Sequence, residues 1–235
     1  MNDATKRRIL NAGSGLTEVV EKLSSIFNPD LWDETRLDVE VKTEPDIVSS
    51  IVDMRAKVQD NAFDAVYSAH AIEHLHAHQV LPAFQEFRRV LKNDGFALLT
   101  CPDLAAICRL VIEKGADAVA YTSPAGPITA IDMLYGHGAS IAHGYLSMAH
   151  NTAFTPERLG RFAVQAGFRE VRLVRGTSYD IWALLMAPDA SIESVQPIFA
   201  NTILEGLCFY VPPGALNPQP EGQAAAEPKL ASAEG

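Results

Sequence analysis

The sequence has few of the features that mark secreted, membrane or metal-binding proteins. Its three cysteines, Cys101, Cys108 and Cys208, show no Cys-x-x-Cys spacing, so neither a disulfide framework nor a zinc knuckle is predicted. No hydrophobic run is long enough to span a membrane. Residues 1–8 are polar and lack the apolar core of a signal peptide. These absences predict a cytoplasmic protein with no membrane partner.

Positive charge is also scarce. The formal net charge is −10 over 235 residues, whereas proteins that grip nucleic acid need basic surface to neutralise phosphates. We therefore expect no nucleic-acid partner. The serines form no Gly-x-Ser-x-Gly nucleophile elbow. Hydrophobic residues make up 48% of the chain, which predicts one globular domain with a sizeable core.

The most informative segment present is a short apolar run followed by two glycines. Ile9 and Leu10 lead into Asn11-Ala12-Gly13-Ser14-Gly15. A strand that ends in a glycine turn before a helix opens many nucleotide-binding βαβ units. The third glycine of the dinucleotide fingerprint is missing, because Leu16 and Thr17 stand there. An ordinary strand-to-helix turn is the alternative interpretation.

Strand and helix patterns alternate after this turn, which predicts a doubly wound, mostly parallel sheet. Asn93-Asp94-Gly95 is read as the end of a helix that begins near Pro82, and 121–127 as a loop. Further helices are predicted over 17–27, 105–114 and from 155. The predicted strands after the first are 35–41, 45–54, 63–67, 96–100, 170–176 and 180–187.

Acidic residues alternate with apolar ones in the second predicted strand. Asp38 and Glu40 lie at or near its end, where a carboxylate can accept hydrogen bonds from both hydroxyl groups of a ribose. Acids that merely face water from a half-exposed strand are the alternative.

Several motifs occur in a characteristic order. The most specific are the predicted helix end Phe87–Gly95 and the segment Glu73-His74-Leu75. In chain order they are Leu10–Gly15, Leu37-Asp38, Asp46-Ile47-Val48 with Asp53, Phe63–Val66, Glu73-His74-Leu75 and Phe87–Gly95. Together they resemble a class I S-adenosylmethionine-dependent methyltransferase, of the small-molecule branch called methyltransferase type 11. The resemblance covers roughly 8–104 and 155–187. It implies a Rossmann-like sheet of about seven strands whose last strand is antiparallel, S-adenosylmethionine as cofactor and a small-molecule acceptor.

The resemblance also implies which residues contact the cofactor. Backbone amides of the glycine turn would face the methionyl part, Asp38 would hold the ribose with Glu40 in reserve, and Asp53 would accept from the adenine amino group. The family usually has an acid where Asn11 stands, and this departure weakens the expected grip on the cofactor's ammonium. The complete set of expected cofactor residues is Asn11, Gly13, Ser14, Gly15, Asp38, Asp53, Met54 (through its amide) and Ser68.

Residues 105–154 do not belong to the minimal sheet. An insert after the fifth strand lies over the carboxyl edge, where ligands bind, so we interpret it as a lid and substrate wall. His137 and His150 in the insert, and His70 after the fourth strand, are the candidate catalytic residues. Loop capping and hydrogen bonding within the lid is the alternative, and His74 is expected to be structural. No metal site is predicted, because the insert histidines are too loosely spaced.

The organisation expected is a methyltransferase domain over 1–190, a packing extension over 191–211 and a disordered tail over 212–235. The apolar segment 203–211 either packs on the domain's own flank or forms a homodimer contact. Two rival functions remain. One is a non-catalytic module that binds S-adenosylmethionine, and the other is a nicotinamide-dependent oxidoreductase on a similar sheet.

Overall fold

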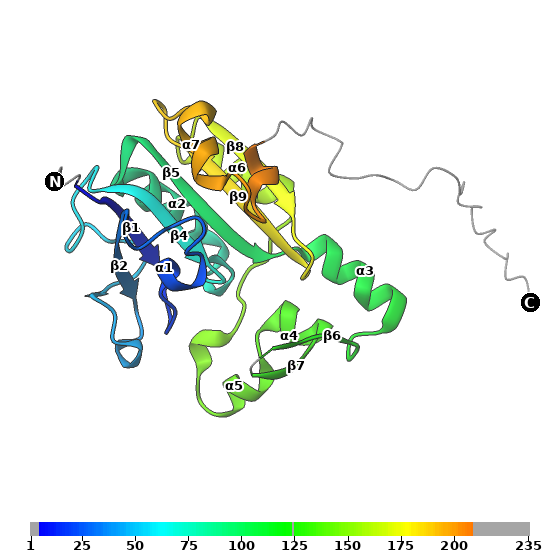
Figure 1. Cartoon of the computed structure of the whole chain (residues 1–235). Coiled ribbons are helices and arrows are strands. Elements are labelled where there is room, and N and C mark those ends of the chain that lie inside the picture. Colours follow the sequence, from blue (N-terminus) through cyan, green and yellow to red (C-terminus); the bar gives the residue numbers. More distant parts are fainter. Residues whose placement is uncertain (1–4, 124, 209–235) are drawn as a thin grey trace, which may run out of the picture.

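The computed structural model describes residues 5–123 and 125–208. Their main feature is a seven-stranded sheet with the order β3-β2-β1-β4-β5-β9-β8 (Figure 1). Only β9 among these strands is antiparallel to its neighbours β5 and β8. This confirms the Rossmann-like fold with an antiparallel last strand. The strands are β1 (Arg7–Ala12), β2 (Trp32–Asp38), β3 (Ile47–Val48), β4 (Phe63–Ala69), β5 (Leu91–Pro102), β8 (Glu170–Arg175) and β9 (Asp180–Met186).

Helices cover both faces of the sheet. On one face α2 (Val80–Val90) and α6 (Pro156–Gln165) pack their apolar stripes against the strands. On the other face lie α1 (Val19–Lys22), α7 (Ile192–Phe199) and the 3-10 helix η5 (Glu205–Cys208). Each face therefore has its own hydrophobic core, as expected of strands that are buried on both sides.

Three predicted elements in the first half have different bounds. The predicted helix 17–27 is only the four residues of α1, because the apolar residues Leu23, Ile26 and Phe27 reach the core from turns. The second strand lies three residues earlier than predicted, so Asp38 is its last residue. The third strand shrinks from 45–54 to two residues, since it is an edge strand that pairs only with β2.

Two turn predictions were wrong. The segment 93–95 does not end a helix, because α2 stops at Val90 and β5 runs through it. A Cβ on Gly95 would lie 2.8 Å from the carbonyl oxygen of Asp64, so this glycine permits close approach of β5 to β4. The predicted loop 121–127 contains an antiparallel hairpin of β6 (Val119–Ser123) and β7 (Gly126–Thr129). Every residue of β6 is at least partly exposed, so this strand lacks the alternation of buried and exposed residues by which a strand is predicted.

The insert forms a separate lobe beyond the carboxyl end of β5 (Figure 1). Its buried residues Ile107, Leu110, Ile128, Ala130 and Met133 make a small core of their own. Besides the hairpin it contains α3 (Leu104–Lys114), α4 (Ala130–Tyr135), α5 (Gly138–Ala142) and η4 (Leu146–Met148). The remaining 3-10 helices of the described residues lie in the sheet domain: η1 (Val41–Thr43), η2 (Ile72–His74) and η3 (Ala77–Gln79).

The C-terminal extension packs on the sheet domain as far as it is described. Leu204, Leu207 and Cys208 are buried in the core beneath α7, and Arg172 donates a 2.6 Å hydrogen bond to the Cys208 carbonyl. These contacts match the packing interpretation. Residues 209–211 and the predicted tail 212–235 lie outside the described residues, and the dimer contact stays a prediction.

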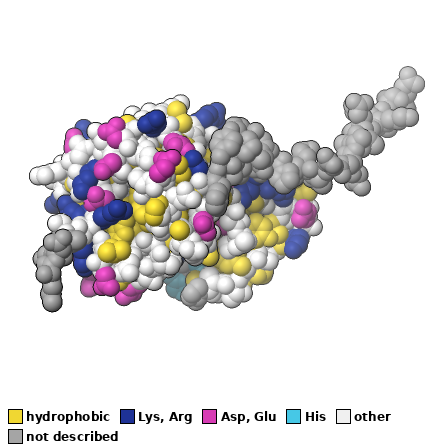
Figure 2. Space-filling view, turned by 45° about the horizontal axis from the view of Figure 1, so that its top comes forward, with side chains coloured by type: hydrophobic (Ala, Val, Ile, Leu, Met, Phe, Trp, Pro, Cys, Tyr) yellow, Lys and Arg dark blue, Asp and Glu magenta, His cyan; other side chains and the backbone are white. Residues whose placement is uncertain are grey.

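The described surface shows no dominant charge of one sign on the face in Figure 2. Lysine and arginine side chains there are interspersed with aspartate and glutamate, and hydrophobic side chains gather between them. Among the described residues no helix has the length and apolar character needed to cross a membrane.

Candidate functional site

The glycine turn after β1 bridges β2 and the loop that follows β4. The amides of Gly13 and Ser14 both donate to the Leu37 carbonyl, at 2.8 and 3.1 Å. Gly13 has a φ of +75°, and a Cβ there would stand 2.5 Å from the Ala71 Cβ. Only glycine satisfies both demands. The turn is thereby held against the segment that begins at His70.

Asp38 closes this turn from the end of β2. One of its carboxylate oxygens accepts the Gly15 amide and the other accepts the Glu40 amide, each at 2.8 Å. Each oxygen retains a lone pair for a further donor. The Glu40 carboxylate instead accepts the Lys42 amide and caps η1. Asp38 therefore lies at the carboxyl end of β2, and its contact with a ribose stays a prediction.

Asn11 has a partly buried acid, Glu34, beside it. Its side-chain amide donates to the Glu34 carboxylate and to the Thr17 carbonyl, both at 2.8 Å. Because both partners only accept, the amide orientation is fixed. Glu34 also accepts the Val19 and Val20 amides at the start of α1. A carboxylate in place of Asn11 would repel Glu34.

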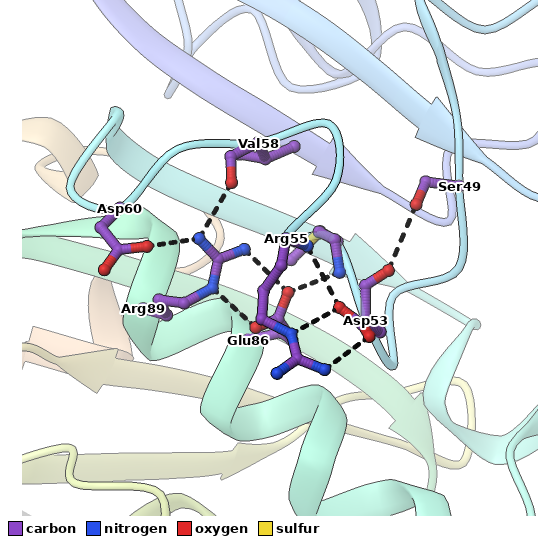
Figure 3. A network of polar contacts seen from close by, with 8 residues as sticks. Ser49, Asp53, Arg55, Val58, Asp60, Glu86 and Arg89 are labelled. Carbon is purple, nitrogen blue, oxygen red and sulfur yellow. Dashed lines mark hydrogen bonds and ion pairs between the residues drawn. The ribbon is translucent and has the colours of Figure 1, made fainter.

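A polar network holds the loop that contains Asp53 and Met54 (Figure 3). The Met54 amide donates to Glu86 at 2.5 Å, and Arg89 binds both Glu86 oxygens at 2.6 and 2.8 Å. Arg89 also donates to Asp60 at 2.6 Å. The hydrogen bonds and negative charge of Glu86, joined by Asp60, raise the pKa of Arg89. An adenine contact by the Met54 amide would have to replace its bond to Glu86.

Asp53 and Ser68 face different surroundings. Asp53 is exposed, and its hydrogen bonds with Arg55, aided by the charge of that side chain, lower its pKa to about 2. It is therefore an ionised acceptor at the loop surface. Ser68 is buried and donates to the Ala12 carbonyl at 2.8 Å, which ties β4 to the end of β1.

A cavity of about 200 Å³ lies between the sheet edge and the insert. Since a water molecule occupies about 30 Å³ of the liquid, this space can hold part of a small organic molecule. Its walls come from the loop after β4, the end of β5, the insert and the turn before β9. They are His70, Glu73, His74, Pro102, Tyr121, Ile128, Asp132, Met133, His137, Met148, His150, Ser178 and Tyr179.

His70 begins the segment that links the glycine turn to the cavity. Its φ of +50° is unusual for a residue with a side chain, and Nδ1 lies 3.2 Å from Glu73 Oε1. Desolvation beside the cavity would lower the pKa of His70, but the hydrogen bond and charge of Glu73 outweigh it and raise the pKa. Burial lowers the pKa of His150, so its imidazole is kept neutral.

Residues 10–99 match the family model described as "Methyltransferase domain". Over this segment, which is less than half of the chain, the sequence therefore has the pattern of a class I methyltransferase domain that uses S-adenosylmethionine. No curated protein sequence matches the chain.

Solved structures share the fold of this methyltransferase domain. An S-adenosylmethionine-dependent methyltransferase from Archaeoglobus fulgidus has a TM-score of 0.52 and 13% identity, over 77% of this chain and 86% of that one. The CMeT domain of the citrinin polyketide synthase has a TM-score of 0.52 and 12% identity, over 81% of this chain and 48% of that one. The DszA carbon methyltransferase has a TM-score of 0.51 and 15% identity, over 81% of this chain and 50% of that one. The chain thus spans about half the length of the last two.

The glycine turn and Asp38 of the methyltransferase domain fit the cofactor's requirements. A side chain is excluded at Gly13, while nothing lies within 4 Å of the position a Cβ would take on Gly15. The acceptor carboxylate of Asp38 thus stands beside open space at Gly15, at the carboxyl ends of β1 and β2, where such folds bind their ligands. The amides of Gly13, Ser14 and Gly15 already donate to Leu37 and Asp38. The individual cofactor contacts assigned to Asn11, Gly13, Ser14, Gly15, Asp38, Asp53, Met54 and Ser68 all stay predictions.

The three candidate catalytic histidines of the methyltransferase domain line one cavity. His70 comes from the sheet side, and His137 and His150 come from the insert. Sequence reasoning gave no role to Glu73 and expected His74 to be structural, although both line the same cavity. It also missed Glu34. This residue continues the every-second-residue spacing of Arg36, Asp38 and Glu40, which was the available signal.

We expect Asp38→Ala to weaken binding of S-adenosylhomocysteine by about tenfold or more. A carboxylate that accepts from two hydroxyl groups contributes about 1–3 kcal/mol, and about 1.4 kcal/mol is one decade in affinity. Calorimetry measures the change, with Glu40→Ala as the control that removes a nearby acid from the same edge. A loss confined to Glu40→Ala would move the ribose site two residues onward.

Proposed function

We propose that this protein transfers the methyl group of S-adenosylmethionine to a small-molecule acceptor held in the cavity under the insert. The observation that carries the proposal is continuity between the two sites. Gly13 of the cofactor turn stands against Ala71, and the flanking residues His70 and Glu73 line the cavity. An acceptor bound there would adjoin the cofactor site, which is what direct transfer requires.

The protein has little covalent work to do in such a reaction. S-adenosylmethionine supplies a methyl group already activated on a sulfonium. The chain's residues must orient the acceptor, exclude water and, where the acceptor carries a proton, remove it. The insert supplies the cover through Tyr121, Met133 and Met148. His70 and His150 supply imidazoles with oppositely shifted pKa values.

The proposal is tested first by cofactor choice. We expect calorimetry to detect binding of S-adenosylmethionine and S-adenosylhomocysteine but not of NAD. Binding of NAD alone would support the oxidoreductase alternative. Incubation with trideuteromethyl-labelled S-adenosylmethionine and fractionated small-molecule extracts should then label a product that mass spectrometry detects. Cofactor binding with no labelled product from any extract would support the non-catalytic module.

We expect His137→Ala and His150→Ala to lower the rate of methyl transfer while changing the affinity for S-adenosylhomocysteine by less than about twofold. Both side chains line the cavity and lie outside the glycine turn, and a loss confined to the transition state appears in kcat. His143→Ala is the matched control, because His143 is an exposed insert histidine bonded to the Ala139 carbonyl. Equal rates in all three variants would make the two imidazoles structural.

A further inference from the structure

Three potential metal ligands converge where the sheet domain meets the insert. Glu73 and His74 belong to η2 after β4, and His150 follows η4 of the insert. One ligand atom from each residue lies within 4.8 Å of the others. The rings of His74 and His150 are 4.9 Å apart between centroids and nearly perpendicular, at 68°.

The two imidazoles are held in the tautomer that leaves Nε2 free to bind. His74 Nδ1 is 3.1 Å from the Ala149 carbonyl oxygen, and His150 Nδ1 is 3.0 Å from the Met133 carbonyl oxygen. A carbonyl oxygen only accepts, so each Nδ1 carries the proton and each Nε2 keeps its lone pair. Backbone carbonyls orient histidine ligands in this way in metal sites.

Glu73 brings a buried negative charge with one unused oxygen. The residue is 1% exposed. Its Oε1 faces His70 Nδ1, whereas Oε2 is buried with no hydrogen-bond partner among the described residues. A buried carboxylate oxygen without a donor is costly unless a cation meets it.

Backbone hydrogen bonds keep the two segments together. The Glu73 carbonyl accepts the amides of Asn151 and Thr152, at 2.9 and 3.2 Å. The Asn151 side chain donates to the His74 carbonyl at 2.8 Å. His150 is thus held opposite Glu73 and His74 by hydrogen bonds of Asn151 and Thr152, the two residues that follow it, as a preorganised ligand set requires.

We propose that Glu73 Oε2, His74 Nε2 and His150 Nε2 bind a divalent transition-metal ion of the Zn²⁺ type. Two neutral imidazoles and one carboxylate suit Zn²⁺ and its first-row neighbours, whereas Mg²⁺ and Ca²⁺ take oxygen ligands. Bonds of about 2.0–2.1 Å place tetrahedral ligand atoms about 3.4 Å apart, so the ion would draw the three side chains slightly together.

The position of this site assigns the ion a function. All three ligands line the cavity, so a remaining coordination position would face its contents. An acceptor hydroxyl bound there would lose its proton more easily, because a bound metal ion lowers the pKa of its oxygen ligands. This consequence, a hydroxyl acceptor, rests on the proposed function, whereas binding of the ion does not.

Calorimetry with ZnCl₂ on chelator-treated full-length protein tests the site directly. We expect one Zn²⁺ per chain in the wild type. Glu73→Gln, which preserves shape, and His150→Ala should each weaken binding by at least about tenfold. Zn²⁺ should raise the melting temperature of the wild type but not that of Glu73→Gln. Co²⁺ should bind in its place and give visible absorption that both variants lose.

The control removes the other histidine pair of the described chain. His76 and His78 are exposed and stacked at 5.9 Å, so they are the main source of adventitious binding. His76→Ala/His78→Ala should retain wild-type affinity. No Zn²⁺ binding by the wild type, or binding lost in this double variant and retained in Glu73→Gln and His150→Ala, overturns the proposal. Since none of these measurements uses methyl transfer, a failed transferase assay leaves them interpretable.

Discussion

Arg89→Met is expected to lower the free energy of unfolding by about 3 kcal/mol, within the range for breaking a buried ion pair. Glu86 is only 7% exposed, and Arg89 binds both of its oxygens. Without Arg89 the buried carboxylate keeps the Met54 amide as its one donor among the described residues. For a chain of this size the loss corresponds to a melting temperature lower by about 6–12 °C.

The same substitution at Arg55 is the matched control. Arg55 pairs with Asp53 in the same loop, but these side chains are 72% and 53% exposed. Because water screens exposed pairs and already solvates both groups, Arg55→Met should leave the melting temperature unchanged. Calorimetric unfolding of both variants measures the difference. Equal melting temperatures would mean that the network in Figure 3 does not anchor this loop.

The spacing of apolar residues was sufficient to predict the elements that form the centre of the sheet and one of its covering helices. The apolar run at Ile9 and Leu10, the buried strand that begins at Phe63 and the amphipathic α2 each bury a face that their spacing shows. The edge strand β3 and the exposed hairpin β6–β7 bury too little to leave such a pattern. Hydrogen bonding rather than side-chain burial defines those two elements, and the sequence does not display it.

The candidate sites differ in the same way. The glycine turn follows β1 and Asp38 is the last residue of the neighbouring β2, so strand order alone brings them together. The contact between His74 and His150 joins residues far apart in the chain, through the backbone of 149–152. No spacing rule relates them. The expectation of no metal site considered the insert histidines without this partner, and the Zn²⁺ site at Glu73, His74 and His150 is a testable alternative to it.

Gly136→Ala is expected to displace His150 from the cavity. Gly136 ends α4 with a φ of +96°, and a Cβ there would stand 2.0 Å from the Met148 carbonyl oxygen. The next segment includes His150, whose amide donates to the Tyr135 carbonyl at 3.1 Å. An alanine must therefore push 148–150 away from α4. We expect amide hydrogen exchange in 131–150 to accelerate on the order of a hundredfold, equal to about 2.7 kcal/mol of local stability.

Gly144→Ala is the control that distinguishes the effect of the steric clash at Gly136 from the effect of placing an alanine at a positive φ. Gly144 lies in the same lobe with a φ of +92°, but nothing lies within 4 Å of the position that a Cβ would take there. Its alanine variant bears only the conformational cost, about 1–2 kcal/mol, so exchange should accelerate much less. Gly136→Ala should also weaken Zn²⁺ binding, whereas Gly144→Ala should not. Equal exchange in the two variants would show that the Met148 carbonyl yields easily, and unchanged Zn²⁺ binding in Gly136→Ala would show that His150 keeps its place without the contact to α4.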